Sequence, residues 1–465
     1  MVSYGFYMAW APQYALLLFA ATLISYLSAI KIANFSHARV FLVLGIVLNI
    51  SILFFFKYVD FALTLLQRLC GTIGIHFVAP VFSILLPVGI SFYTFQSIGY
   101  MVDVYRDPKE VERNFLSYML FMSFFPQITS GPIARAKNLL PQLNAVNRAS
   151  TQQVSMGLKL MLIGYFKKIV LADTIGVFVN QVYADISAYS GLTVLAVIIG
   201  YTIQIYCDFS GYSDIAIGAA RTMGIHLQAN FNAPYFAYSI KDFWRRWHIS
   251  LSSWLRDYIY IPLGGNRKGF VRKLFNTFMT FFISGLWHGA NLTFIVWGIL
   301  HGMFQIIEDI ATRIIKKSAS SSQPRGLMLY IRRILTFAAV SFAWIFFRAS
   351  DISQAFSVIH QSLTGWSLSL LIADYKQILS QAFMASSTLY HMYFYMMVIS
   401  LIILFLIDCY QNRHYKDANA ALCFRIFPST VRWIVYLILG IFIVFFFILQ
   451  NGIFGQMGQF IYFQF

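Results

Sequence analysis

Long runs without a charged residue are the feature that most constrains how this chain folds. They are residues 11–30, 77–102, 186–207, 274–300, 383–407 and 434–465. Because about 20 apolar residues in a helix cross the hydrocarbon core of a bilayer, each run can span a membrane at least once. With shorter apolar tracts near 40–56, 155–171 and 334–347, they predict roughly ten to twelve membrane segments.

Composition and pattern support the same class of protein. Only 11% of the residues are charged and 59% are hydrophobic, whereas soluble domains carry about a quarter charged residues. The runs do not alternate between polar and apolar residues as barrel strands do. We therefore expect an all-α polytopic membrane protein, built as a single transmembrane domain over 1–465 without a soluble domain.

The formal net charge of +17 is concentrated in three segments, residues 135–173, 241–273 and 308–333. Basic loops mark the cytoplasmic side of membrane proteins, so we expect these segments to face the cytoplasm. The lipid bilayer is the expected partner, and no nucleic acid is expected. The scattered cysteines, Cys70, Cys207, Cys409 and Cys423, lack metal-ligand spacing and predict neither a metal site nor a disulfide framework.

Two apolar tracts are interrupted by Pro and Gly. Residues 85–106 contain Pro87 and Gly89, and residues 124–135 contain Pro126, Gly131 and Pro132. Broken backbone at membrane depth is tolerated where protein or a water-filled cavity satisfies its polar groups. We expect the second tract to be re-entrant and the molecule to enclose a polar cavity.

The segment "KDFWRRWHISLSSWLRDYIYIPLGGNRKG" (241–269) is basic and rich in aromatic residues. A cation at the bilayer centre costs about 2.5–3.5 kcal/mol on insertion scales, whereas Trp and Tyr favour the headgroup layer. We therefore predict an interfacial helix with Trp247, Leu251 and Trp254 on one face. His248 within it is, taken alone, more typical of a structural residue.

A second histidine, His288, lies inside an uncharged run, in "GLWHGANLTFIVWG". An ionisable residue at membrane depth is a candidate functional residue, and burial favours the neutral imidazole that can accept a proton. A packed histidine bonded to a neighbouring carbonyl is an equally good interpretation of the residues alone. His301 is interpreted as structural. Asp208 and Asp214 could bind a cation, but we expect them to pair with Arg245 and Arg246.

Six segments in this order resemble the membrane-bound O-acyltransferase superfamily, specifically its bacterial alginate and peptidoglycan O-acetyltransferase branch. They are "LLPVGISFYTFQSIGYMVDVYR", "FFPQITSGPI", "YCDFSGYSDIAIG", "NFNAPYFAYSIKDFWRRWHISLSSWLRDYIYIPLGGNRKG", "GLWHGANLTFIVWG" and the terminal "FIYFQF". The resemblance implies helices around a central funnel and an active-site pair, His248 and His288, of which His288 is catalytic. The side chains expected to bind substrate are Trp287, Asn291, Arg245, Arg246 and Ser252.

The resemblance also implies a reaction. An acetyl group would move from a cytoplasmic thioester, such as acetyl-CoA, to a hydroxyl reached from the other side of a bacterial inner membrane. His288 would act as the base and His248 as the positioning or polarising group, with no bound cofactor. The polymer, which could be alginate, peptidoglycan or another exopolysaccharide, would receive the acetyl group through a separate extracytoplasmic Ser/His/Asp-type acetyltransferase. This partner is expected to dock near "FIYFQF" or near Pro126–Pro132.

Two other functions are also compatible with the sequence. One is D-alanyl transfer to teichoic acid, whose donor is a carrier protein. The other is a non-enzymatic transporter that uses the histidines as a proton relay, although the chain lacks the internal repeats typical of transporters. Relatives usually have an additional apolar segment before the part that resembles "SYGFYMAW" (3–10), so we expect their first helix to be missing here.

Overall fold

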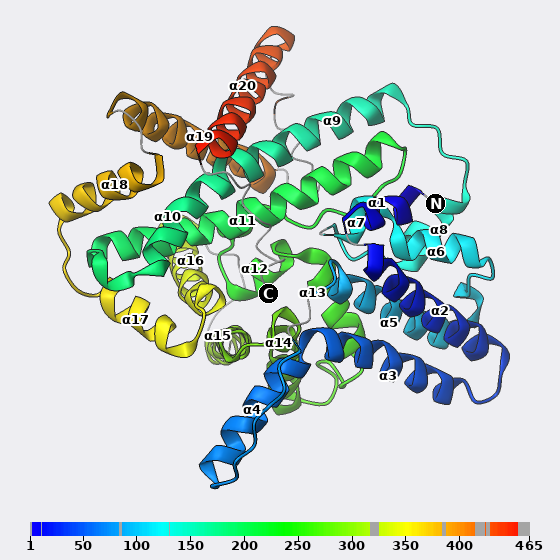
Figure 1. Cartoon of the computed structure of the whole chain (residues 1–465). Helices are drawn as coiled ribbons and strands as arrows, with labels where there is room; N and C mark the ends of the chain where they lie inside the picture. Colours follow the sequence, from blue (N-terminus) through cyan, green and yellow to red (C-terminus); the bar gives the residue numbers. More distant parts are fainter. Residues whose placement is uncertain are drawn as a thin grey trace.

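All described secondary structure is helical. The structure is a computed structural model that describes residues 2–10, 12–82, 86–129, 131–316, 325–383, 387–413, 424 and 428–453, and these contain no strand (Figure 1). Seven helices in this part of the chain include a stretch long and apolar enough to cross a membrane. They are α2 (Pro12–Asn34), α3 (Ala38–Lys57), α11 (Gly191–Thr222), α15 (Leu292–Lys316), α16 (Leu327–Arg348), α19 (Ser387–Arg413) and α20 (Ser429–Ile453). The expected all-α polytopic architecture is confirmed.

Other expected segments correspond to short or interrupted helices. Among the described residues of the tract 77–102, helix begins only at α5 (Ile90–Arg106), which follows Gly89 with its positive φ of 75°. The tract 155–171 is α9 (Thr151–Tyr165) followed by the π-helical turn η2 (Phe166–Ala172) and α10 (Asp173–Ala184). The tract 274–300 is divided between α14 (Phe270–His288) and α15.

Further helices surround these. They are α1 (Val2–Trp10), α4 (Val59–Thr72), α6 (Phe115–Ser123), α7 (Phe125–Ile128), α8 (Ala136–Asn144), α17 (Ile352–Ser362) and α18 (Leu368–Phe383). The expected re-entrant tract contains α7, whose Pro126 and Gln127 are buried, and the amide of Gln127 donates to the Phe121 carbonyl at 3.3 Å. The terminal "FIYFQF" lies outside the described residues.

Glycines let α9 and α11 pack with their backbones in close contact. A Cβ atom built on Gly164 would lie 2.6 Å from the Gly211 carbonyl, and one on Gly157 would lie 2.6 Å from the Gly218 carbonyl. Small residues at such a crossing allow the van der Waals contact that drives helix association in membranes. The same relation holds between α14 and α15, where a Cβ on Gly298 would lie 2.5 Å from the Phe281 carbonyl.

Buried ion pairs join η2 to α11. The Lys167 ammonium lies 2.8 Å from Asp214, and the Lys168 ammonium lies 2.7 Å from both Asp208 and Asp173. The expectation that Asp208 and Asp214 pair with arginines is therefore wrong. The π-helical turn places two consecutive lysines against α11, and a low-dielectric interior favours paired charges over single ones.

The basic segment that begins at residue 241 is not one interfacial helix. It forms α12 (Ile240–Arg246), α13 (Ile249–Leu255) and the π-helical turn η5 (Arg256–Tyr260), and α12 and α13 lie at the centre of the molecule (Figure 1). The chain breaks at His248, which has left-handed backbone angles (φ 42°, ψ 56°). Trp247 is 1% exposed. The prediction of an interfacial helix was wrong because tertiary packing encloses the aromatic face.

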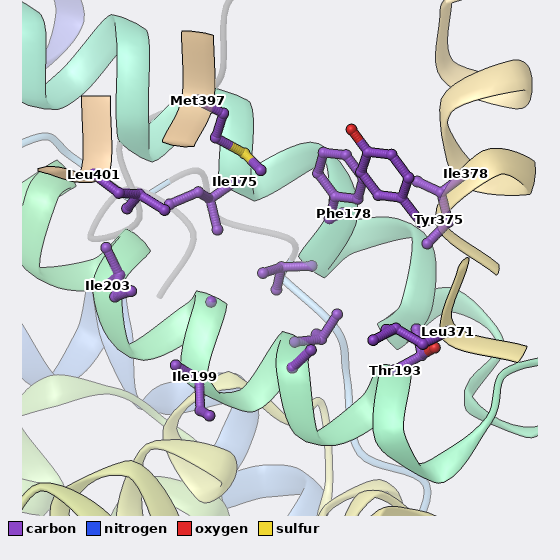
Figure 2. Close-up of a pocket in the computed structure, with 14 residues that line it drawn as sticks. Ile175, Phe178, Thr193, Ile199, Ile203, Leu371, Tyr375, Ile378, Met397 and Leu401 are labelled. Atoms are coloured by element: carbon purple, nitrogen blue, oxygen red, sulfur yellow. The ribbon is translucent and has the colours of Figure 1, made fainter. Parts of the chain in front are cut away.

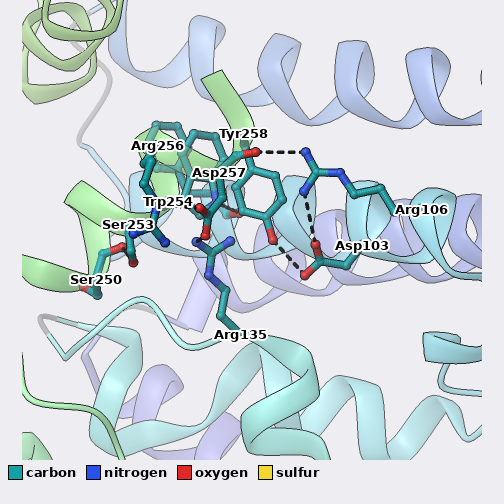
Figure 3. Close-up of polar contacts among 10 residues, drawn as sticks. Asp103, Arg106, Arg135, Ser250, Ser253, Trp254, Arg256, Asp257 and Tyr258 are labelled. Atoms are coloured by element: carbon teal, nitrogen blue, oxygen red, sulfur yellow. Dashed lines mark hydrogen bonds and ion pairs between the residues drawn. The ribbon is translucent and has the colours of Figure 1, made fainter. Parts of the chain in front are cut away.

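A polar network holds η5 against α5 (Figure 3). The Tyr258 hydroxyl donates to Asp103 at 2.7 Å, and Arg106 donates to the Asp257 carbonyl at 2.9 Å. Arg135 forms an ion pair with Asp257 at 3.0 Å and lies 4.4 Å from the centre of the Tyr258 ring. These contacts fix the end of the α12–α13–η5 segment relative to α5.

The glycine contacts predict a position-dependent effect of one methyl group. Gly164→Ala should reduce the free energy of unfolding by about 1–3 kcal/mol, because α9 and α11 must separate to admit the Cβ. Gly440→Ala in α20 is the matched control, since a Cβ there meets no atom within 4 Å. Thermal unfolding of both purified variants in detergent measures the difference. Equal unfolding temperatures for the two variants would contradict the close packing of α9 and α11.

Candidate active site

The two histidines predicted to form a pair belong to one aromatic cluster. The ring centre of Trp287 lies 6.3 Å from that of His248 and 4.9 Å from that of His288. His248 is 1% exposed and His288 is 4% exposed. Trp297 and Phe347 pack on His288 with ring centres at 4.8 and 5.1 Å. The fold thus brings together residues that lie 40 positions apart in the sequence.

The hydrogen bonds around His248 determine its tautomer. The backbone N–H of Ser250 donates to Asn230 Oδ1 at 3.2 Å, which identifies this atom as the amide oxygen. His248 Nδ1 lies 3.1 Å from the same oxygen and must therefore carry the proton. In a neutral ring Nε2 is then an acceptor, and this buried atom has no hydrogen-bond partner among the described residues. His248 is oriented to accept a proton or a hydrogen bond at Nε2.

The loop that carries Asn230 also satisfies the broken backbone at His248. The N–H of Ile249 donates to the Asn230 carbonyl at 2.9 Å, and the N–H of Asn232 donates to the Arg246 carbonyl at 2.9 Å. Asn230 Nδ2 in turn donates to the Ser213 hydroxyl of α11 at 3.1 Å. The left-handed conformation of His248 is thus held from two sides.

His288 is the last residue of α14. The next residue, Gly289, has no Cβ atom, and a Cβ atom at this position would collide with the Phe294 ring. Glycine therefore lets the chain pass close to this ring directly after His288. His288 and His301 both pack on Trp297, with ring centres at 4.8 and 4.9 Å. His301 is packed among aromatic rings, and its Nδ1 accepts from Trp244 Nε1 at 3.3 Å.

A cavity of about 560 Å³ opens beside α12 and α13. Its lining includes the basic residues Lys241, Arg245, Arg256 and Lys273, together with one acid, Asp309. Asp309 binds both lysines, with Lys273 at 2.8 Å. Arg245 is exposed and forms no ion pair within the described part of the chain. The cavity therefore presents net positive charge and one readily available guanidinium group.

A second polar cavity, of about 490 Å³, lies beside the end of α14. It is formed by α4, the turn between α14 and α15, and the start of α17. Its polar lining residues are Thr64, Arg68, Asn291, Ser350, Asp351 and Ser353. Asn291 donates to the Ser350 carbonyl at 2.6 Å, which joins the two loops of the cavity wall. Hydroxyl and amide groups of this kind suit an alcohol or sugar ligand.

The two polar cavities lie at different places along α14. Lys273, Thr277, Thr280 and Phe281 of this helix line the basic cavity, whereas Ala290, just beyond its end, lines the second cavity. His248 lies next to the basic cavity, because Ile249, which follows it directly, lines that cavity. His288 lies two residues before Ala290, which lines the second cavity.

The expected substrate-binding residues do not all line the same cavity. Arg245 and Ser252 line the basic cavity, and Asn291 lines the other one. Trp287 lies between the histidines, and its indole N–H has no partner among the described residues. Arg246 lines neither cavity, since it binds Asp242 at 3.1 Å and Asn412 at 2.9 Å.

A third cavity, of about 280 Å³, is apolar (Figure 2). It lies between α10, α11, α18 and α19, and only Thr193 and Tyr375 bring hydroxyl groups to its lining. The Thr193 hydroxyl donates to Asp374 at 2.6 Å. The described residues of its lining include no basic or acidic side chain. Within the described residues no cluster of three metal-ligating side chains occurs.

Sequence analysis missed Asn230 and Lys273 as members of the site. Asn230 belongs to the quoted motif "NFNAPY", but an asparagine in a loop gives no signal of which histidine it will bind. Lys273 was counted among the basic residues of a cytoplasmic loop. Its place in the cavity depends on how α14 and α15 pack, which the sequence pattern does not show.

Comparison with known proteins places this geometry in a family context. The membrane-bound O-acyltransferase family model matches residues 109–350. The chain is 38% identical over 379 residues to a probable alginate O-acetylase of Pseudomonas aeruginosa, covering 80% of this chain and 70% of that protein. It is 34% identical over 412 residues to a peptidoglycan O-acetyltransferase of Helicobacter pylori, covering 82% and 76%.

A third relative is less similar. A teichoic acid D-alanyltransferase of Streptococcus thermophilus is 31% identical over 258 residues, which covers 53% of this chain and 62% of that protein. Both identity and coverage therefore favour the O-acetyltransferase branch over the D-alanyltransferase branch.

The contacts of Asn230 predict one tautomer of His248. Solid-state NMR of protein labelled with ¹⁵N-histidine should show protonated Nδ1 and unprotonated Nε2, assigned by loss of the signals in His248→Asn. In Asn230→Ala the oxygen that fixes Nδ1–H is gone, so both tautomers should be observed. Ser213→Ala, which removes only the partner of Asn230 Nδ2, should retain the wild-type tautomer. A protonated Nε2 in the wild-type protein would contradict the assignment.

Proposed function

The chain belongs to the membrane-bound O-acyltransferase family, and from this premise we propose that it carries acetyl groups across the inner membrane for O-acetylation of an extracytoplasmic polysaccharide. The observation that supports this most is the pair of unlike polar cavities beside α14, one next to His248 and the other just beyond His288. A donor can enter from one side and an acceptor from the other. The names of the more similar relatives point to alginate, peptidoglycan or a related polymer as the acceptor.

The basic cavity is the proposed donor site, facing the cytoplasm. Its segment, residues 241–273, carries a concentrated positive charge, which favours the cytoplasmic side. Coenzyme A carries three phosphate groups, and guanidinium groups bind phosphate with paired hydrogen bonds. Arg245 is the best placed residue, because it has no carboxylate partner among the described residues. Acetyl-CoA is therefore the proposed donor, and another acyl thioester is the alternative.

The proposed reaction needs three contributions from the chain. His288 takes the proton of the attacking hydroxyl and returns it to the departing sulfur, so the C–O bond forms as the C–S bond breaks. The indole N–H of Trp287 donates to the carbonyl oxygen as negative charge develops there. His248 accepts a hydrogen bond at Nε2 and orients a reactant. Its tautomer favours this positioning role over the polarising one, because neutral Nε2 cannot donate.

A separate extracytoplasmic acetyltransferase of the Ser/His/Asp type is the proposed immediate acceptor. The second cavity measures about 490 Å³ and is lined by short loops and α4, which suits a side-chain hydroxyl better than several sugar rings. A serine hydroxyl of such a partner could enter it, take the acetyl group as an ester, and pass it to the polymer.

Two other functions make different demands. D-alanyl transfer would require a carrier protein as donor, and the chain would then not use free acetyl-CoA. A transporter with a histidine proton relay would change ion flux without forming an ester. Acetyl transfer from acetyl-CoA with no change in proton flux would exclude both.

Separate variants should alter catalysis and donor binding. His288→Ala should lower kcat by about 10²–10⁴, since a general base is lost. Arg245→Ala should leave kcat similar and raise KM for acetyl-CoA about 10–100-fold, since a charge-assisted phosphate contact is lost. The assay is release of CoA from labelled acetyl-CoA by inverted vesicles that contain the chain and its partner.

His360→Ala serves as the control, because this histidine lies on α17 outside the lining of both polar cavities. It should behave as wild type. Near wild-type turnover by His288→Ala at equal expression would refute the assigned base.

The sidedness and the partner are tested together by vesicle orientation. Acetyl-CoA, which does not cross membranes, should support transfer in inverted vesicles and not in right-side-out vesicles. Proteoliposomes with acetyl-CoA on the cytoplasmic face and polysaccharide on the other should acetylate the polymer only when the partner is added. Efficient polymer acetylation by the chain alone would refute the division of labour. Turnover only in right-side-out vesicles would refute the orientation.

A further inference from the structure

The C-terminal end of α14 is held by two residues from the joint between α3 and α4. The last carbonyls of a helix have no partner within the helix and need other donors when they are buried. Lys57 Nζ donates to the carbonyls of Trp287 at 2.9 Å and His288 at 2.8 Å. The adjacent Tyr58 hydroxyl donates to the Leu286 carbonyl at 2.6 Å. Three consecutive carbonyls at the end of α14 are thus satisfied from one point.

Lys57 also connects α14 to the start of α5. Its Nζ lies 3.4 Å from the Ser91 hydroxyl, so three acceptors surround an amine with three possible donors. Directly after Ser91, Phe92 packs on Trp287 with ring centres 5.7 Å apart. Phe95, one turn later, stacks on Trp287 at 5.1 Å. The Lys57 side chain therefore joins α14, which carries Trp287, to α5, whose aromatic rings pack on Trp287.

This arrangement is unusual for a lysine at the end of a membrane helix. Such lysines commonly extend their amine toward water or headgroups. Lys57 forms no ion pair within the described part of the chain, and its amine is directed at a helix C-terminus, where a positive charge is favoured. The tract that precedes it, 40–56, is apolar.

We propose that Lys57 is a positioning residue of the acyl-transfer site. By binding the carbonyls of Trp287 and His288 it sets where α14 ends, and so it sets the place of the His288 ring and of the Trp287 indole N–H. This inference rests on the proposed function of His288. Lys57 is not among the residues that line the basic cavity, so this role does not depend on binding the donor there.

Three substitutions test the proposal in the vesicle assay. Lys57→Met keeps the length of the side chain and removes its donors. It should lower kcat about 10²-fold, the effect of a displacement of about 1 Å at a reacting group, and leave KM for acetyl-CoA unchanged. Lys57→Arg, which retains several donors, should restore most of kcat. Lys31→Met on α2 is the control, since Lys31 contacts Phe41 and should not affect turnover.

Wild-type kcat in Lys57→Met would overturn the proposal. The proposal would also be overturned if Lys57→Met and Lys57→Arg lost kcat equally and both had a lowered unfolding temperature, because that result indicates general destabilisation. If Lys57→Met does not fold, Lys57→Gln, whose shorter side chain cannot bind both the Trp287 and His288 carbonyls as Nζ does, must show the same loss of kcat at unchanged KM. Wild type and His288→Ala are measured alongside. Absence of wild-type turnover contradicts the proposed function itself, whereas active Lys57→Met beside inactive His288→Ala contradicts only the role of Lys57.

Discussion

Every helix that ends inside this molecule must find hydrogen-bond partners in protein, because hydrocarbon supplies none. The break at His248 is satisfied by the loop that carries Asn230, and the end of α14 is satisfied by Lys57 and Tyr58. Both breaks lie at the histidine pair. Uninterrupted helices would leave no room for a polar reaction at membrane depth, so the satisfied breaks are what make a site possible.

The surrounding frame is rigid for a different reason. Glycines bring α9 against α11 and α14 against α15 at backbone contact, while the lysines of η2 form buried ion pairs with α11. Breaking one partner of a buried pair leaves an uncompensated charge, which commonly costs about 3–5 kcal/mol. α11 also carries Ser213, which binds Asn230, so the same helix supports the frame and orients His248.

The two polar cavities differ in charge. Basic residues gather where a phosphate-bearing donor would enter, and neutral polar groups predominate in the cavity beyond His288. Between them, aromatic rings enclose both imidazoles, with Trp287 shared by the pair. Such an enclosure excludes water, which strengthens hydrogen bonds to a developing charge. It would also protect the proposed thioester donor from hydrolysis.

Uncharged runs, broken tracts and motifs are local properties, and they are enough to predict the all-helical membrane class, the family resemblance and the two candidate histidines. The packing of the helices shows that Asp208 and Asp214 pair with lysines, that the basic segment is central and broken, and that Arg245 and Asn291 line different cavities. These outcomes depend on which helices meet. A lysine, an asparagine or an arginine has the same local signature whether it binds a lipid, a helix end or a substrate, and packing alone selects among them.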